Sequence, residues 1–469
     1  MIRNITISGN VSVGLKSLGG VLTNFHNMTL ESVTITDIFA SDGGGIYFNT
    51  TTPVTLTIKN TILAGNGTDD CYFQTIAGGA TINDLGYNLV QADNQLHPCG
   101  FVGGVNNNLV TVPFLLPLAD NGGSTQTHAL ELDSPAIDAG DTSLPTDQRG
   151  VARPQGAADD IGAYESQACD ETAWFVTRPG QLDAAIDCFN AKTNPGVYTI
   201  NITRGFPAQA STTPIDNSTP GVSLVIEGSG NSVDWNGDLF PGTRPFLIQA
   251  NTTVTINDLA INNGNVLGTE LGGAIRNLGN LTLNRSSIRG NRAENSGGGI
   301  NNAPGAVMVI NDSTIAGNEV QGGSASVSGG GINNEGSLTI RNSSISGNTS
   351  SNNGGGIGNS GTLNLDSVTV TGNTALGASL GAFGAGVYNG GFGSLATRNS
   401  ILAGNLGAED CYTSLSITDG GHNLVQTQSN CGFVDGVNGT IVGQSANLGP
   451  LQDNGGPTRT HALLGGSPA

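Results

Sequence analysis

An eleven-residue string recurs along the chain and constrains the fold more than any other feature. It reads LTLNRSSIRGN at 281–291 and LTIRNSSISGN at 338–348, with related copies at 308–318, 363–373 and 395–405. One more copy, LTIKNTILAGN, occupies 56–66. A repeat of this length cannot bury an apolar face alone, so successive copies must stack on one another.

Within each copy, apolar and polar residues alternate and then turn a corner. Leu338 and Ile340 face one side, and Ile345 faces the same side after the corner. This period of two is typical of strands and not of helices. The strings are separated by GGAI or GGGI, whose glycines adopt conformations that a Cβ disfavours. We therefore predict an all-β fold, a parallel β-helix of roughly 25–30 residues per coil with coils about 4.8 Å apart.

Each string closes on an asparagine. Stacked one strand spacing apart, identical amides can hydrogen-bond in a ladder that satisfies polar groups at a buried corner. The alternative is that they line a ligand groove. We predict a structural ladder formed by Asn291, Asn318, Asn348, Asn373 and Asn405.

Charge and composition exclude several classes of function. The 469 residues include 73 Gly and 51 Asn, and the formal net charge is -20. Phosphate binding relies on clustered Lys and Arg, so a nucleic-acid partner is not expected. The longest purely apolar runs are a few residues, such as FLL at 114–116, so no membrane insertion is expected.

The six cysteines predict disulfides. Sequence order and the duplicated context of the first and last pairs favour Cys71–Cys99, Cys169–Cys188 and Cys411–Cys431 among fifteen connectivities. A metal site is the alternative, but CxxC is absent and histidines are few. Disulfides imply an extracellular or cell-surface location.

Two tandem units are predicted from a second duplication. Residues 61–136 and 400–469 run in parallel, with ADNGGSTQTHAL matching QDNGGPTRTHAL and DSPA matching GSPA. We assign 1–166 to the C-terminal part of a first unit with its closing segment, and 167–469 to a second unit truncated in that segment. We expect the chain to be an internal piece of a longer protein. QLDAAIDCFNA at 181–191 has helical apolar spacing and predicts a short capping helix at the start of the second unit.

These motifs resemble those of bacterial right-handed parallel β-helix repeat proteins that carry a choice-of-anchor Q domain. The resemblance is carried by NSILAGN, GHNLV, CGFV and DNGGPTRTHAL in the second unit, and by DSPAIDAG, DQRGVARP and DIGAYE in the first. GGGI and SGN also resemble the repeats of polymorphic outer-membrane proteins. The resemblance covers nearly the whole chain and implies a right-handed coil and a large exported, anchored protein. It implies no established catalytic activity.

An enzyme must still be weighed, because lyases and glycoside hydrolases also use this fold. They need clustered carboxylates. Glu294, Glu319 and Glu335 lie at corners, at unequal offsets from the closing asparagines. Asp312 and Asp366 also occupy corner positions, but one residue out of register with each other. We interpret these carboxylates as solvated corner charges and expect no catalytic residues.

Two further sets of residues have alternative roles. His128 and His461 lie in duplicated THAL motifs, and we expect each to bond a nearby carbonyl rather than act as a base. We expect no cofactor and no metal site. Calcium is the alternative, held by the acidic tail of the first unit, which contains Asp138, Asp141, Asp147, Asp159 and Asp160.

The sequence thus predicts a secreted or cell-surface protein that acts as a non-catalytic stalk or adhesin and contacts glycans or other cells. The 374–394 insertion, with Phe383, Tyr388 and Phe392 in or beside it, is the best candidate for a binding loop. The rival hypothesis is a polysaccharide lyase or glycoside hydrolase with its site on the lateral face of the coils. Rows of Ser, Thr and Asn would favour the adhesin, and aligned carboxylates beside a groove would favour the enzyme.

Overall fold

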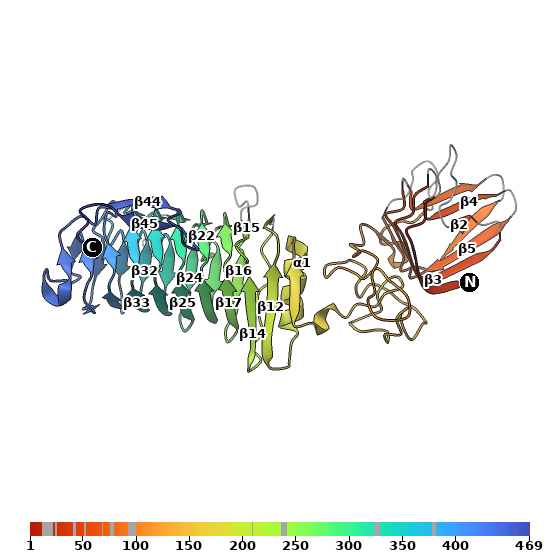
Figure 1. Ribbon diagram of the computed structural model, residues 1–469, viewed down its shortest axis with the longest axis horizontal. Coiled ribbons are helices and arrows are strands. Elements are labelled where there is room, and N and C mark those ends of the chain that lie inside the picture. Colours follow the sequence, from red (N-terminus) through yellow and green to blue (C-terminus); the bar gives the residue numbers. More distant parts are fainter. Residues whose placement is uncertain are drawn as a thin grey trace. The chain divides into compact units, whose positions relative to one another are not determined.

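The computed structural model describes residues 1–11, 22–23, 26–40, 44–50, 53–67, 69–75, 79–91, 100–208, 210–235, 242–322, 329–377 and 381–469. The chain divides into two compact units, Met1–Asp170 (unit 1) and Glu171–Ala469 (unit 2). Within each unit, short parallel strands from successive coils pair into sheets that extend along the axis of the stack (Figure 1). The predicted all-β, parallel β-helical fold is confirmed. The predicted division into 1–166 and 167–469 rests on the duplicated motifs and stays a prediction.

Two ten-stranded parallel sheets run along unit 2. Sheet one consists of β11 (Ala173–Val176), β12 (Gly196–Ile202), β14 (Val222–Glu227), β17 (Thr253–Asn257), β21 (Asn280–Asn284), β25 (Val307–Asn311), β29 (Ser337–Arg341), β33 (Thr362–Asp366), β37 (Ser394–Arg398) and β40 (Thr418–Asp419). Sheet two consists of β13 (Phe206–Pro207), β15 (Ser232–Asp234), β18 (Ala260–Asn262), β22 (Ser287–Arg289), β26 (Thr314–Ala316), β30 (Ser344–Ser346), β34 (Thr369–Thr371), β38 (Ile401–Leu402), β41 (Leu424–Val425) and β43 (Ile441–Val442).

Two shorter parallel sheets complete the coils of unit 2. An eight-stranded sheet consists of β16 (Phe246–Ile248), β20 (Ile275–Asn277), β24 (Ile300–Asn302), β28 (Ile332–Asn334), β32 (Ile357–Asn359), β36 (Val387–Asn389), β39 (Cys411–Thr413) and β42 (Gln428–Ser429). A five-stranded sheet consists of β19 (Asn265–Val266), β23 (Arg292–Ala293), β27 (Glu319–Val320), β31 (Thr349–Ser350) and β35 (Thr374–Ala375).

The core of unit 2 is built from identical positions of successive repeats. In sheet one the strand register places one apolar residue of each coil directly over the next, and each is at most 2% exposed: Leu281, Met308, Leu338, Leu363 and Leu395. Burying one such side chain contributes about 1.5–3 kcal/mol. The alternating pattern therefore fixes the register, because a slip of one residue would turn every one of these side chains outward.

Glycines of the GGGI motifs are required where the chain turns between coils. Gly329 has φ +74°, in the left-handed region that residues with a Cβ rarely adopt. A Cβ on Gly331 would lie 2.7 Å from the carbonyl oxygen of Gly356 and 3.0 Å from Cγ of Asn348. The motif thus allows adjacent coils to approach closely beside the buried asparagines.

The predicted capping helix is present as α1 (Pro179–Asn190). Its buried face includes Leu182, Ala185, Ile186 and Phe189. The helix packs against β11 and β12, the first two strands of sheet one (Figure 1). It therefore covers the start of the unit 2 stack, where an open strand edge would invite pairing.

Unit 1 contains a seven-stranded and a three-stranded parallel sheet. The first comprises β1 (Ile2–Ser8), β3 (Met28–Thr36), β5 (Val54–Lys59), β6 (Ile62–Ala64), β8 (Ala80–Asp84), β9 (Leu89–Val90) and β10 (Leu109–Val110). The second comprises β2 (Leu22–Thr23), β4 (Ile46–Thr50) and β7 (Cys71–Thr75). Residues 111–166 form no named helix or strand. Isolated bridges join residues within this segment, and side-chain hydrogen bonds such as that from Asn60 to the carbonyl of Asp160 attach it to the coils.

Short elements near the ends of both units repeat one another. The 3₁₀ helices η1 (Val105–Asn107) and η3 (Val437–Gly439) each follow a left-handed glycine, and η2 (Ala168–Asp170) lies at the end of unit 1. In unit 2 an antiparallel hairpin, β44 (Leu448–Gln452) and β45 (Thr460–Leu463), folds back on sheet two. The duplicated sequences therefore adopt duplicated local structures.

Candidate functional site

The outward-facing positions of sheet one form straight rows of side chains. The strand register aligns the central row across seven successive strands: Thr255, Thr282, Val309, Thr339, Asn364, Ala396 and Thr418. Five of these seven residues carry a hydroxyl or an amide. Since the strands lie about 4.8 Å apart, the row presents polar groups at regular intervals.

A second outward row, at the next outward position along each strand, is tied together by amides. Asn257 donates to Glu227 Oε1 at 2.8 Å, Asn284 donates to Asn257 Oδ1 at 2.9 Å, and Asn311 donates to Asn284 Oδ1 at 2.9 Å. These side chains are half-buried. The outer amides are therefore held in one orientation, with further hydrogen-bonding capacity left for a ligand or water.

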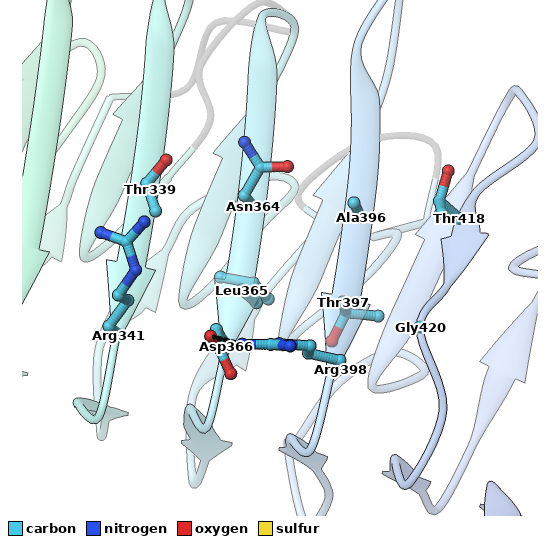
Figure 2. Close-up of a pocket in the computed structure, with 10 residues that line it drawn as sticks. All are labelled: Thr339, Arg341, Asn364, Leu365, Asp366, Ala396, Thr397, Arg398, Thr418 and Gly420. Carbon is cyan, nitrogen blue, oxygen red and sulfur yellow. Dashed lines mark hydrogen bonds and ion pairs between the residues drawn. The ribbon is translucent and has the colours of Figure 1, made fainter. Parts of the chain in front are cut away.

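The same row continues as Arg341, Asp366 and Arg398 and borders a shallow cavity of about 210 Å³. Figure 2 shows these side chains below Thr339, Asn364, Ala396 and Thr418. Arg398 reaches across to Asp366, with Nη2 and Oδ2 2.6 Å apart. The cavity lies where the small side chain of Ala396 leaves space between its polar neighbours in the central row, Asn364 and Thr418.

The ion pair determines what this cavity can do chemically. The hydrogen bond from Arg398 lowers the pKa of Asp366, and the same bond raises the pKa of Arg398. Asp366 therefore stays ionised and has no proton to give as a general acid, and Arg398 stays charged and cannot act as a base. The lining groups are suited to hydrogen-bonding a polar ligand, not to proton transfer.

The five asparagines of the predicted ladder lie in one column inside unit 2. Each side-chain amide donates to the Oδ1 atom of the next, all at 2.9 Å, from Asn291 through Asn318, Asn348 and Asn373 to Asn405. The first four are at most 1% exposed. Those four are therefore closed to a ligand, and their amides link one coil to the next.

The ladder ends on a carboxylate that the sequence argument overlooked. Asp410 Oδ1 accepts from the backbone N–H and the side-chain amide of Asn405, at 2.8 and 2.7 Å. Its Oδ2 accepts from the backbone N–H and hydroxyl of Thr427. In unit 1, Asp70 accepts from Asn66 in the same way. The duplicated aspartate before Cys71 and Cys411 was the signal for this role.

A second internal ladder was also missed. It runs from Asn277 to Asn302, Asn334, Asn359 and Asn389 at 2.6–2.8 Å and ends on the hydroxyl of Thr413. Its signal is the asparagine two residues after the Ile or Val of each GGGI-type motif. These asparagines lie outside the eleven-residue strings that close in GN, so the repeat of those strings does not include them.

The cysteines are oxidised where the structure describes them. Cys411 and Cys431 form a disulfide with Cα atoms 6.1 Å apart. Cys71, Cys169 and Cys188 are also disulfide-bonded, and no described cysteine is free. Cys99 lies outside the described residues. The predicted pairs Cys71–Cys99 and Cys169–Cys188 stay predictions.

The two histidines of the THAL motifs have matching partners. His128 Nδ1 lies 2.8 Å from the carbonyl of Leu116, and its Nε2 lies 2.8 Å from Ser8 Oγ. His461 Nδ1 lies 2.7 Å from the carbonyl of Gly449, and its Nε2 lies 2.8 Å from Ser346 Oγ. The predicted carbonyl bonds are confirmed, and the hydroxyl bonds fasten each THAL motif to a strand.

The acidic tail of unit 1 is engaged by protein donors. Asp141 pairs with Lys59, and Asp147 pairs with Arg149. Asp138, Asp159 and Asp160 accept backbone N–H groups. Within the described ranges, no three His, Cys, Asp or Glu side chains group so that they could hold a metal ion.

Asp160 is the most perturbed carboxyl of this tail. Burial, followed by the charge of Glu165, raises its pKa to about 7. Burial also raises the pKa of Glu165, which pairs with Arg153 at 2.8 Å. The side chains of Arg153 and Glu165 are at most 1% exposed. A perturbed acid can mark an active site, but this one lies in a closed network of bonds within the tail.

The five corner carboxylates weighed as catalytic candidates do not converge. Asp366 and Glu319 pair with arginines, and Asp312 accepts from Asn342. Glu294 accepts a hydrogen bond from a backbone N–H group, and Glu335 accepts one from a side-chain amide. Each is thus bonded on its own coil or to an adjacent one.

The 374–394 insertion places aromatic rings together, apart from residues 378–380, which lie outside the described ranges. Tyr388 stacks on Tyr412 with ring centroids 5.5 Å apart, and Phe383 lies 4.6 Å from the same ring. Phe392 is 97% exposed. The insertion therefore contributes apolar surface beside the coils.

None of the helices in the described part of the chain is long and apolar enough to cross a membrane. Comparison of the chain with protein-family models, with curated proteins and with solved structures found no match.

Proposed function

We propose that this chain belongs to a secreted or cell-surface β-helix repeat protein that acts as a non-catalytic stalk or adhesin and contacts glycans or other cells. Membership of the choice-of-anchor Q class of β-helix repeat proteins is part of the proposal. The oxidised cysteines support an extracellular location, because disulfides persist in oxidising compartments.

One observation carries the adhesive role: the regular outer rows of hydroxyl and amide groups on sheet one. Thr255, Thr282 and Thr339 lie in one row, and Asn257, Asn284 and Asn311 lie in the next. Sugars offer many hydroxyls that donate and accept, so repeated neutral polar groups suit them. Two carboxylates of this outer row are each bonded to a neighbour: Asp366 pairs with Arg398, and Glu227 accepts from Asn257.

The rigid framework supports the stalk role. Two buried amide ladders run across the coils of unit 2, and each buried amide requires a partner in the next coil. Losing one partner leaves a buried polar group unsatisfied, which costs about 1–3 kcal/mol. Such a stack resists local opening and projects its ends at a fixed separation.

The test is a binding and depolymerisation assay of the protein against a panel of neutral and acidic polysaccharides, with and without calcium. The key variant replaces Thr255, Thr282 and Thr339 by Val, which the row already accommodates at Val309. The matched control replaces the same residues by Ser and keeps the hydroxyls. We expect binding that is lost in the Val variant and kept in the Ser variant.

One outcome would overturn the proposal, and another would reduce it to the stalk role. New reducing ends or unsaturated products would show an enzyme and direct attention to the lateral carboxylates. Absence of binding to every glycan and to cell surfaces would remove the adhesive role and leave a spacer.

A further inference from the structure

The first three coils of unit 1 and the last three GN-closing coils of unit 2 share short matching strings at equivalent positions. IRNITISGN (2–10) matches IRNSSISGN (340–348), ESVTIT (31–36) matches DSVTVT (366–371), and KNTILAGN (59–66) matches RNSILAGN (398–405). The strand register is also the same: Arg3 pairs with Glu31 and Glu31 with Lys59, as Arg341 pairs with Asp366 and Asp366 with Arg398. Each unit thus carries one basic–acidic–basic row.

In unit 1 the closing segment, residues 137–166, lies against Glu31 and Lys59 of this row. Asp141 Oδ2 lies 3.1 Å from Lys59 Nζ. Glu31 Oε1 accepts from the hydroxyl of Ser143 at 3.0 Å, while its Oε2 pairs with Arg3 at 2.8 Å. The closing segment therefore places an acid against Lys59 and a hydroxyl against Glu31, while the side chain of Arg3 stays 44% exposed.

The corner residues beside the row bind the same segment. Ser32 donates to the hydroxyl of Thr142 at 2.9 Å. The Asn60 amide donates to the carbonyl of Asp160 at 3.0 Å and accepts from the backbone N–H of Asp141 at 3.2 Å. Ser32 and Asn60 are 0% exposed as a result.

The equivalent residues of unit 2 are uncovered but arranged alike. Ser367 and Asn399 are exposed, and the Arg398 side chain is 66% exposed. The amide of Asn399 donates to Ser367 Oγ at 3.0 Å, as the amide of Asn60 donates to Ser32 Oγ at 3.1 Å. The unit 2 surface is therefore preformed for the contacts that its counterpart makes.

The hairpins that precede the closing segment are equivalent too. His461 is fastened to Ser346 as His128 is fastened to Ser8, and these serines occupy matching positions on their coils. The hairpin of unit 2 is thus anchored by the same His–Ser contact as the hairpin of unit 1. In unit 1 the chain continues from this hairpin into the closing segment.

We propose that Arg341, Asp366 and Arg398, with the corner residues Ser367 and Asn399, form a docking site for a peptide segment of the same chemistry as residues 137–166. In the docked state an aspartate of that segment faces Arg398, hydroxyls face Asp366, and backbone groups pair with the Asn399 amide. The proposal goes beyond the adhesive role and does not depend on glycan binding.

The experiment extends the full chain by a copy of residues 137–166 placed directly after Ala469. DSPA and GSPA end at equivalent alanines, so the junction has the same spacing as in unit 1. Hydrogen–deuterium exchange is followed in peptides covering 363–373 and 395–405. We expect exchange there to slow at least about tenfold relative to the unextended chain. The control carries a scrambled copy of 137–166, and equal slowing by the scrambled copy would overturn the proposal.

A matched pair of variants makes the result specific. Gly at Asn60 or Asn399 removes the amide and keeps the positive φ of 51° or 48°. We expect Asn60→Gly to speed exchange of the closing segment in unit 1, and Asn399→Gly to leave the unextended chain unchanged. In the extended chain, Asn399→Gly should remove most of the added protection. Protection that survives Asn399→Gly and Arg398→Glu together would show that the segment does not dock at this site.

Discussion

The asparagine ladder that starts at Asn291 ends where the side-chain amide of Asn405 donates to the carboxylate of Asp410, with Nδ2 2.7 Å from Oδ1. Every earlier member of the ladder both donates and accepts, so a column of amides has no natural end. A carboxylate only accepts, and Asp410 receives four N–H or O–H groups from Asn405 and Thr427. The negative charge is therefore a structural terminator of the stack.

Asp410→Asn should destabilise unit 2 although the side chain keeps its shape. Whichever way the new amide is oriented, its NH₂ group faces donors from Asn405 or Thr427. We expect a loss of about 1–3 kcal/mol in the free energy of unfolding. The measurement is urea denaturation followed by tryptophan fluorescence, since both tryptophans of the chain, Trp174 and Trp235, lie in unit 2.

Asp435→Asn is the control for this change. Asp435 is exposed, and its Oδ1 accepts from the backbone N–H of Val442 at 2.9 Å, which an amide oxygen can also do. The urea midpoint of the Asp435→Asn variant should remain close to that of the unchanged protein. Equal midpoints for Asp410→Asn and Asp435→Asn would show that the ladder does not need an anionic end.

Buried and outer amides should differ sharply in their contribution to stability. Asn348 is 0% exposed and bonds to both neighbouring coils, so Asn348→Ala leaves buried donors and acceptors unpaired. We expect a loss of at least about 2 kcal/mol. Asn284→Ala, in the outer row, should cost less than about 1 kcal/mol because water replaces its partners.

The comparison uses the same denaturation assay on both variants. Both replacements remove one amide from a continuous row, so the difference isolates burial. A loss at Asn284 as large as that at Asn348 would contradict the assignment of the outer row as a solvated binding surface.

The sequence predicted the fold because repetition makes each local pattern count many times. One alternation around Leu338 and Ile340 would be ambiguous, but the same alternation in successive coils fixes which face is buried. The positions of the first ladder followed from the same repetition. The second ladder was missed although Asn277 and its equivalents recur at much the same spacing, because they lie outside the eleven-residue string that defined the repeat.

The site around Asp366 and Arg398 could not be predicted from the sequence, because it depends on which residues the strand register brings together. Asp366 and Arg398 are 32 residues apart, and only the register of β33 and β37 makes them a pair. The likeness between this row and the row of unit 1 is visible in the sequence. The sequence does not show that the row of unit 1 is contacted while the row of unit 2 is exposed, because this depends on where residues 137–166 fold back.

The disulfide between Cys411 and Cys431 should stabilise the last coils of unit 2. It closes a loop with a sequence separation of 20 residues, and both cysteines are at most 1% exposed. Replacing both with Ala should lower the free energy of unfolding by about 2–4 kcal/mol, mainly through the entropy of the unfolded chain. The readout is the tryptophan-monitored urea midpoint under non-reducing conditions, and an unchanged midpoint would contradict a stabilising role.

The stability of unit 1 should fall as pH rises toward neutrality. Burial raises the pKa of Asp160 from 3.8 to about 7, with Glu165 adding to the shift and Arg153 opposing it. Between these two values the folded state holds a proton that the unfolded state has released, so unfolding is favoured by raising the pH. Calorimetry between pH 5 and 8 should show the unit 1 transition moving to lower temperature up to about pH 7 and then levelling. Asp160→Asn cannot titrate and should flatten this dependence whatever its own melting temperature. An unchanged slope in Asp160→Asn would show that another group holds the proton.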